Sequence, residues 1–122
     1  MNKQLVFEES IIYMHDDLDP WAALRVGFDE ERNLVFELVL ERYDNPEDLL
    51  SCLRKMIIIE RAGIERLMDV TGSSLKSLPG FFSHEYGEKG EAWKTSEVFD
   101  TFYKISNYLT GLKMPYQMMN VE

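Results

Sequence analysis

Cysteine is scarce in this chain, with Cys52 the only one among 122 residues. A single thiol cannot form an internal disulfide, so no covalent cross-link is expected to hold the fold together. The apolar neighbours Leu49 and Leu53 predict that Cys52 is a small buried side chain rather than a reactive thiol. Stability then depends on a hydrophobic core, and 45% hydrophobic residues are enough for a single domain spanning residues 1–122.

Long hydrophobic runs are missing as well. The longest apolar stretches, such as Met56 to Ile59, are far shorter than the roughly 20 residues that a helix needs to cross a bilayer. The first residues, MNKQLVFEES, turn acidic before the apolar core of a signal peptide could form. We therefore expect no membrane partner and a cytoplasmic location.

Positive charge is in short supply, because 13 lysines and arginines stand against 22 aspartates and glutamates, for a net charge of −9. Residues 1–45 contain eleven of the acids and four of the bases, a balance of −7, whereas the rest of the chain is close to neutral. A negative field repels phosphate backbones and attracts basic surfaces. The composition thus argues against a nucleic acid as partner and favours a basic protein.

Acidic side chains are densest in two short segments, HDDLDP at residues 15–20 and DEERN at residues 29–33. The carboxylates that we expect to contact a basic partner are Asp16, Asp17, Asp19, Glu30 and Glu31. A calcium loop beginning at Asp17 would need an oxygen ligand and a glycine where Trp21 and Ala22 stand, so we expect no metal here. No segment matches a strong cofactor-binding motif, and no cofactor is expected.

Alternation of apolar and polar residues predicts strands near the N-terminus. We predict a strand from Leu34 to Tyr43. Leucine or phenylalanine occupies alternate positions from Leu34 to Leu40, which is the spacing of a strand with one face in the core. The preceding ALRVGF segment has the same period, and DEERN suits a hairpin turn because Asp29 can bond the backbone and Asn33 tolerates a left-handed conformation. Further upstream, Glu8 to Ser10 interrupt the pattern of LVFEESIIYM and predict a bulge or an edge.

The following segment carries the signals of a helix start. Asn45 suits the cap, proline follows at the first helical position, and the next acids suit the positive end of the helix dipole. A helix from Pro46 to Val70 would have one broad apolar face with Glu60 near its middle. Either the helix breaks at the Ala-Gly pair after Glu60, or this carboxylate faces the core and needs a partner such as Arg25 or His84.

The remaining residues predict further helices and a last strand. In PGFFSHEYGEKGEAW, the glycines and the proline fit the end of one helix near Tyr86 and the start of another near Thr95. The second of these is rich in aromatic residues, and MPYQMMNVE reads as a strand from Tyr116 to Val121. The expected fold is α+β: an antiparallel sheet of three N-terminal strands, joined by the C-terminal one, packed against the long helix and the aromatic-rich helix.

Residues 64–78, IERLMDVTGSSLKSL, resemble the helix-turn-helix of DNA-binding proteins. Gly72 stands at the turn, and two leucines would anchor the second helix. The segment departs from the pattern at Met68 and at the Pro-Gly pair that follows it, and the second helix offers Lys76 as its only base. The resemblance implies a DNA-binding regulator, which is the first alternative function.

A small-molecule binder or enzyme is the second alternative. Its ligand would contact a carboxylate, an imidazole and aromatic rings, namely Glu60, Phe81, Phe82, His84 and Tyr86. The sequence positions no serine or cysteine to act as a nucleophile with His84, so we assign no catalytic residue. The main expectation is a small acidic binding module without enzymatic activity, of the inhibitor, immunity or accessory type, which docks a basic protein.

Overall fold

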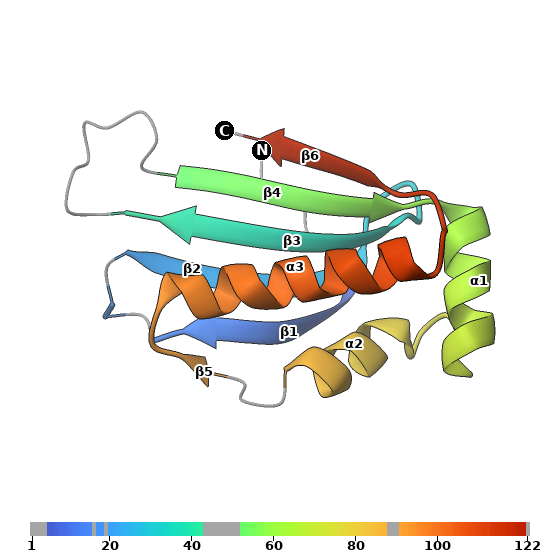
Figure 1. The fold of residues 1–122 in the computed structure, drawn as a ribbon, viewed down its shortest axis with the longest axis horizontal. Helices are drawn as coiled ribbons and strands as arrows, with labels where there is room; N and C mark the ends of the chain where they lie inside the picture. The colour runs from blue at the N-terminus through green and yellow to red at the C-terminus, as the bar shows by residue number, and fades with distance from the viewer. Residues whose placement is uncertain (1–4, 16, 19, 43–51, 88–90, 122) are drawn as a thin grey trace.

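A six-stranded sheet with three helices makes up the computed structural model, which describes residues 5–15, 17–18, 20–42, 52–87 and 91–121 (Figure 1). The strands are β1 (Val6–Met14), β2 (Trp21–Phe28), β3 (Leu34–Glu41), β4 (Cys52–Ile59), β5 (Glu91–Ala92) and β6 (Gln117–Val121). The helices are α1 (Arg61–Thr71), α2 (Leu78–Tyr86) and α3 (Thr95–Gly111). The α+β fold that the sequence predicts is therefore confirmed.

The strands follow the order β5-β1-β2-β3-β4-β6. All neighbours run antiparallel except β1 and β5, which are parallel over two residue pairs. The last strand pairs with β4, so the C-terminal strand joins the sheet as predicted. Two shifts of register in β1, between Val6 and Glu9 and between Ser10 and Ile12, confirm the interrupted pattern at Glu8 to Ser10.

The β2–β3 hairpin closes over residues 29–33. The Asp29 carboxylate accepts hydrogen bonds from the backbone N–H groups of Glu31 and Asn33, both at 2.9 Å, as the turn chemistry predicts. The left-handed residue is Arg32, with φ of 65°, and not Asn33. The Arg32 N–H donates to the Asp29 carbonyl at 3.1 Å, so Arg32 is the last residue of the turn that begins at Asp29.

The prediction of a long helix is wrong for residues 52–59, which form β4. The predicted start of that helix, Pro46, lies outside the described residues. Every residue of β4 has a partner on β3, and five of them also have a partner on β6. Ile57 to Ile59 are β-branched and favour a strand. A helix here would leave β3 paired with β2 alone and would take from β6 the strand with which it pairs, so pairing in the sheet outweighs the helical pattern of the sequence.

The helix that remains, α1, begins after Glu60 and ends at Thr71, one residue beyond the predicted Val70. Gly72 follows it with φ of 70°, and its N–H donates to the Met68 carbonyl at 2.9 Å. The ends of α2 at Tyr86 and the start of α3 at Thr95 also confirm the sequence analysis. The proline and glycine at 79–80 lie in the first turn of α2, where proline is tolerated.

Helices α2 and α3 cover one face of the sheet, and α1 stands at the end where β4 finishes (Figure 1). The core between these layers contains Phe36 of β3, Phe82 of α2 and Phe102 of α3, all fully buried. The opposite face of β2 and β3 presents alternate residues such as Arg25 and Glu37. Among the described residues, no helix is long and apolar enough to cross a membrane.

Candidate functional site

The aromatic residues predicted to bind a ligand lie on α2, but they do not share one environment. Phe82 is completely buried, with its ring centroid 4.8 Å from that of Phe36 and 6.0 Å from that of Tyr86. Phe81 is half-buried and packs edge-on against Phe82 at 5.3 Å. His84 is exposed. Phe82 therefore belongs to the core, and Tyr86 is the member of this set that lines a hollow.

Glu60 lies in a different place from the α2 residues. It is exposed between β4 and α1, accepts a hydrogen bond from the Gln117 side-chain amide at 3.2 Å, and lines a hollow of about 220 Å³ to which α2 contributes no residue. The prediction that Glu60 faces the core assumed a continuous helix through this residue. That helix does not exist, because β4 ends at Ile59. Arg25, one of its expected partners, pairs with Glu37 and Glu8 instead.

The described residues form an acidic hollow of about 390 Å³ between α2 and α3, which we call the α2–α3 hollow. Its lining residues are Ile12, Glu85, Tyr86, Glu97, Asp100, Thr101 and Lys104. Three carboxylates face one amine, so the hollow carries negative charge. Burial, together with Tyr108 and Glu85, raises the pKa of the Tyr86 hydroxyl above its ordinary value of about 10. A tyrosine hydroxyl is protonated at neutral pH even without this shift, so it can donate a hydrogen bond to a ligand.

Local packing fixes the α2 side of this hollow. The Ser83 hydroxyl donates to the Ser10 carbonyl of β1 at 2.6 Å, which joins the helix to the sheet. At the end of α2, Gly87 comes so close to β1 that an added Cβ would lie 2.3 Å from the Ile11 carbonyl oxygen. Only glycine fits there without a shift of the backbone. The carboxylate of Glu85 is thus held at a helix end that is anchored on β1.

The α3 side is fixed by the start of its helix. The Glu97 carboxylate accepts hydrogen bonds from the backbone N–H groups of Trp93 at 2.7 Å and Lys94 at 3.2 Å, so it satisfies donors that a helix start leaves unpaired. Lys94 is the cap residue of α3 and directly precedes the first helical residue, Thr95. Asp100 follows three residues after Glu97 on the same helix face. The Glu97 carboxylate is therefore occupied in stabilising the start of α3, whereas the Asp100 side chain is exposed to solvent.

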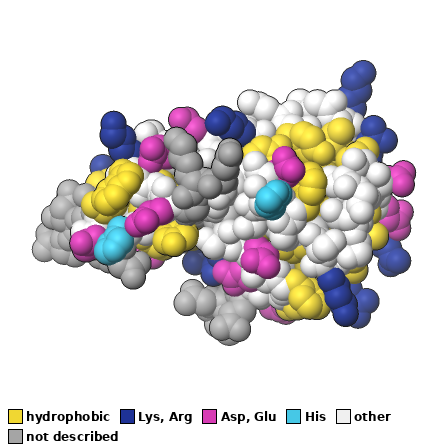
Figure 2. Space-filling model, turned by 90° about the horizontal axis from the view of Figure 1, so that it is seen from below, with side chains coloured by type: hydrophobic (Ala, Val, Ile, Leu, Met, Phe, Trp, Pro, Cys, Tyr) yellow, Lys and Arg dark blue, Asp and Glu magenta, His cyan; other side chains and the backbone are white. Residues whose placement is uncertain are grey.

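An exposed tryptophan stands beside the α2–α3 hollow. Trp93 is 68% exposed and lines a smaller hollow of about 270 Å³ with residues that include Leu18 of the β1–β2 connection. The residue before Leu18, Asp17, has a 79% exposed carboxylate that pairs with the His15 ring at 2.5 Å. Figure 2 shows acidic side chains gathered at one end of this face and again near its middle. Glu91 of β5 pairs with Tyr13 of β1 and is exposed as well, and we define the acidic surface as Asp17, Glu85, Glu91, Trp93 and Asp100.

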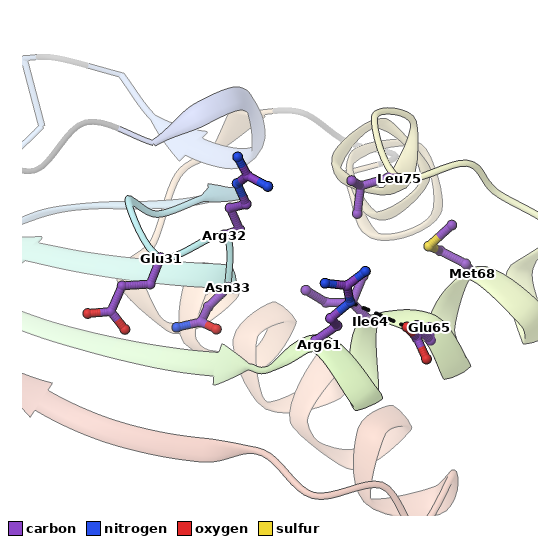
Figure 3. Close-up of a pocket in the computed structure, with 8 residues that line it drawn as sticks. All are labelled: Glu31, Arg32, Asn33, Arg61, Ile64, Glu65, Met68 and Leu75. Carbon is purple, nitrogen blue, oxygen red and sulfur yellow. Dashed lines mark ion pairs between the residues drawn. The ribbon is translucent and has the colours of Figure 1, made fainter.

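The other acidic residues predicted for partner binding do not join this surface. Glu30 and Glu31 follow β2 whereas Asp17 precedes it, and eight strand residues separate the two turns by about 25 Å. Glu31 lines a separate hollow of about 340 Å³ between the hairpin turn and α1 (Figure 3). Asp16 and Asp19 lie outside the described residues. The predicted set therefore divides between two ends of the molecule.

The prediction of a second helix in the helix-turn-helix segment is wrong. Residues 73–77 form a turn in which the Ser77 hydroxyl accepts the Ser74 N–H at 2.9 Å, and α2 begins at Leu78, where the second helix was expected to end. Leu78 is buried, but Leu75 is 48% exposed and anchors no helix. Serine side chains that bond their neighbours' backbone compete with helix formation, which explains the difference.

A buried ion-pair network on the other sheet face escaped the sequence analysis. The Glu37 carboxylate is 5% exposed and contacts both Arg25 and, at 3.4 Å, Arg54, while Arg25 also bonds Glu8 at 3.0 Å. Burial lowers the pKa of Arg25, but Glu37 and Glu8 together raise it further, so its pKa is above the usual value. The sequence contained one signal of this network: the alternation in β3 places Glu37 on the same strand face as Val35 and Val39, opposite to the core leucines. All these charges are paired, which fits a structural role.

No family model, curated protein or solved structure matches this chain. Within residues 5–15, 17–18, 20–42, 52–87 and 91–121, no three His, Cys, Asp or Glu side chains form a group that could hold a metal ion. The acidic surface is thus the feature of the described chain that combines exposed carboxylates, a hollow and an exposed aromatic ring.

Proposed function

We propose that this protein is a small binding module without enzymatic activity that docks a basic segment of a partner protein on the acidic surface. The α2–α3 hollow carries the proposal, because its lining has three carboxylates against one amine beside the 68% exposed Trp93. Complementary charge accelerates encounter and sets orientation. A protein of the inhibitor, immunity or accessory type would work in this way.

The hollow suits a lysine or arginine side chain. Its cationic group would bond the carboxylates of Glu85 and Asp100, while its hydrocarbon stem would pack on the Tyr86 ring. Trp93 offers a second contact, since tryptophan is enriched where binding energy concentrates and its ring attracts cations. Two basic residues of one partner segment, one in each hollow, would use the whole acidic surface.

Peptide binding tests this proposal. A short fluorescent peptide of alternating arginine and glycine is titrated with the protein at about 50 mM and about 300 mM salt, and anisotropy reports the affinity. We expect at least about tenfold weaker binding at the higher salt and for the E85Q/D100N variant. An alternating glutamate and glycine peptide should not bind.

The matched control is E30Q/E31Q. It also removes two negative charges, but from the turn after β2, far from the acidic surface. Its affinity should stay within about twofold of the unchanged protein, because charges separated by more than a Debye length are screened. Equal losses in both variants would mean that net charge alone attracts the peptide. Affinity that is independent of salt would also contradict the proposal.

The remaining sequence hypotheses receive less support. Glu60 and Tyr86 line different hollows, so a shared ligand would have to contact two separate places. A DNA-binding regulator would lack the predicted second helix. The cytoplasm stays the proposed location, on the basis of the sequence.

A further inference from the structure

We propose a second binding site, for a small carboxylic acid with an apolar tail, in the hollow between the β2–β3 turn and α1. This hollow, which we call the turn hollow, measures about 340 Å³ and is separate from the acidic surface. Its volume is at the lower end of small-molecule sites. It is lined by Glu31, Arg32, Asn33, Arg61, Ile64, Glu65, Met68 and Leu75.

One wall of the turn hollow is apolar. Ile64 and Met68 come from successive turns of α1, and Leu75 comes from the connection to α2 (Figure 3). Leu75 is 48% exposed although leucine gains free energy from burial. An acyl or aryl group in the hollow would cover Leu75 and Met68, so apolar contact favours an occupant of this kind.

The other walls carry two arginines. In Figure 3 the guanidinium groups of Arg32 and Arg61 border the space that Leu75 and Met68 also face, whereas the Glu31 carboxylate points away from it. In the part of the chain that the structure describes, Arg32 has no ion pair. A carboxylate between the two guanidinium groups could bond both, because the planar donor fork of arginine matches carboxylate oxygens.

The charges already near the hollow leave room for this anion. Arg61 contacts Glu65 at 3.5 Å, but their side chains are 92% and 67% exposed, and such solvated pairs contribute little. Arg61 can therefore turn to a ligand at small cost. The hairpin holds Arg32 in place, since the Asp29 carboxylate bonds the N–H groups on either side of it.

The chemistry of the walls selects the ligand class. Two arginines against an apolar wall favour one negative charge attached to a hydrocarbon group. A basic peptide would meet two guanidinium groups here and no excess of carboxylates, so the turn hollow and the acidic surface should attract different ligands. Binding at one site should leave the other unchanged, and the two proposals can fail independently.

Three probes separate the contributions of charge and tail. Octanoate has both, acetate has the carboxylate alone, and octanamide has the tail without the charge. Each is titrated into the full chain labelled with ¹⁵N, and chemical shifts report the site and the affinity. We expect saturable octanoate binding with shifts at Arg32, Arg61, Met68 and Leu75. Acetate and octanamide should bind at least about tenfold more weakly, a difference of roughly 1.4 kcal/mol.

Variants identify the arginines. R32Q/R61Q should weaken octanoate binding at least about tenfold. R61Q alone changes a 92% exposed side chain, so it keeps the test valid if the double variant folds poorly, and it should weaken binding several-fold, about threefold or more. The control is R66Q, which removes an exposed arginine of the same helix that does not line the hollow.

Several results would overturn the proposal. Octanamide binding as tightly as octanoate would show nonspecific apolar contact, and acetate doing so would show an adventitious anion site. An equal loss in R66Q and R61Q would reduce the effect to overall charge. The arginine-glycine peptide serves as a cross-check, since its affinity should be the same for R32Q/R61Q and the unchanged protein if the two sites are separate.

Discussion

Arg25 of β2 and Glu37 of β3 lie opposite each other in the sheet and form an ion pair on the face turned away from α2 and α3. The Glu37 side chain is only 5% exposed, whereas that of Arg25 is 34% exposed. A carboxylate with so little water around it depends on its partners, because burying an unpaired charge is costly. Arg54 of β4 supplies the second partner at 3.4 Å.

Removal of one member of this pair should destabilise the fold. We expect R25M to lower the free energy of unfolding by about 3 kcal/mol, because Glu37 would keep only Arg54 as a cationic partner. The double variant R25M/E37M should recover much of this loss, since no charge is left buried. Urea unfolding measures all three proteins. A loss in R25M no larger than in R61A, which breaks an exposed pair, would contradict the buried network.

Two glycines of the α2 region should respond to alanine in opposite directions. In G87A the new Cβ would meet the Ile11 and Ser83 carbonyl oxygens at 2.3 and 2.4 Å, so backbone has to move, and we expect a loss of about 1–3 kcal/mol. In G80A the new Cβ meets no atom within 4 Å, and the helix should gain about 0.5–1 kcal/mol. Thermal unfolding compares the two. Similar effects of both changes would mean that α2 does not end against β1.

Two adjacent phenylalanines should differ in their contribution to stability. F82A removes a ring with no solvent exposure that contacts Phe36, Phe81 and Tyr86, and we expect a loss of about 3–5 kcal/mol. F81A removes a half-buried ring and should cost about half as much or less, because less apolar area returns to water. Denaturant unfolding gives both values. An inverted order would place Phe81 rather than Phe82 in the core.

The tyrosines should titrate unequally at alkaline pH. Hydrogen bonds of the Tyr116 hydroxyl to Ser106 and Thr110 lower its pKa, whereas burial raises the pKa of Tyr86. Measured by ultraviolet difference absorbance, Y116F should remove a tyrosine that ionises below its ordinary pKa, and Y86F should remove one that ionises above it. A transition that is unchanged in Y116F would show that these hydroxyl contacts do not form in solution.

The same shifts predict opposite effects on stability near the ordinary tyrosine pKa of about 10. The pKa of Tyr116 is lower in the folded state, so its ionisation stabilises the fold above the unfolded pKa, and this contribution disappears as pH falls through the folded pKa. The pKa of Tyr86 is higher in the folded state, so its contribution is complete below the unfolded pKa and is lost as pH rises through the folded pKa. The free energy of unfolding of Y116F, Y86F and the unchanged protein, measured at several pH values on either side of about 10, tests both contributions.

Much of the fold could be predicted from local patterns. The alternation that begins at Leu34 and the turn at residues 29–33 both depend on residues close in sequence, and both are confirmed, although Arg32 and not Asn33 takes the left-handed conformation. Cys52–Ile59 is different, because its apolar residues fit a helical face as well as a strand. The choice depends on β3 and β6, which pair with it from both sides and lie far from it in the sequence.

The candidate site was less predictable than the fold. Tyr86 and Asp17 were expected to contact a ligand or partner. Tyr86 lines the α2–α3 hollow, and Asp17 adjoins Leu18, which lines the smaller hollow with Trp93. Glu85, Glu97 and Asp100 were not assigned, because each is an ordinary acid on a helix when seen in sequence. Their charges gather only when α2 and α3 pack side by side on the sheet.

Composition and contacts a few residues long account for the α+β class, the excess of negative charge and the turns. Tertiary structure alone decided that residues 52–59 form a strand, that Glu30 and Glu31 are separated from Asp17, and which carboxylates share a hollow. The physical reason is the same for all three: hydrogen bonds between strands and packing of helices on a sheet join residues that no local pattern connects.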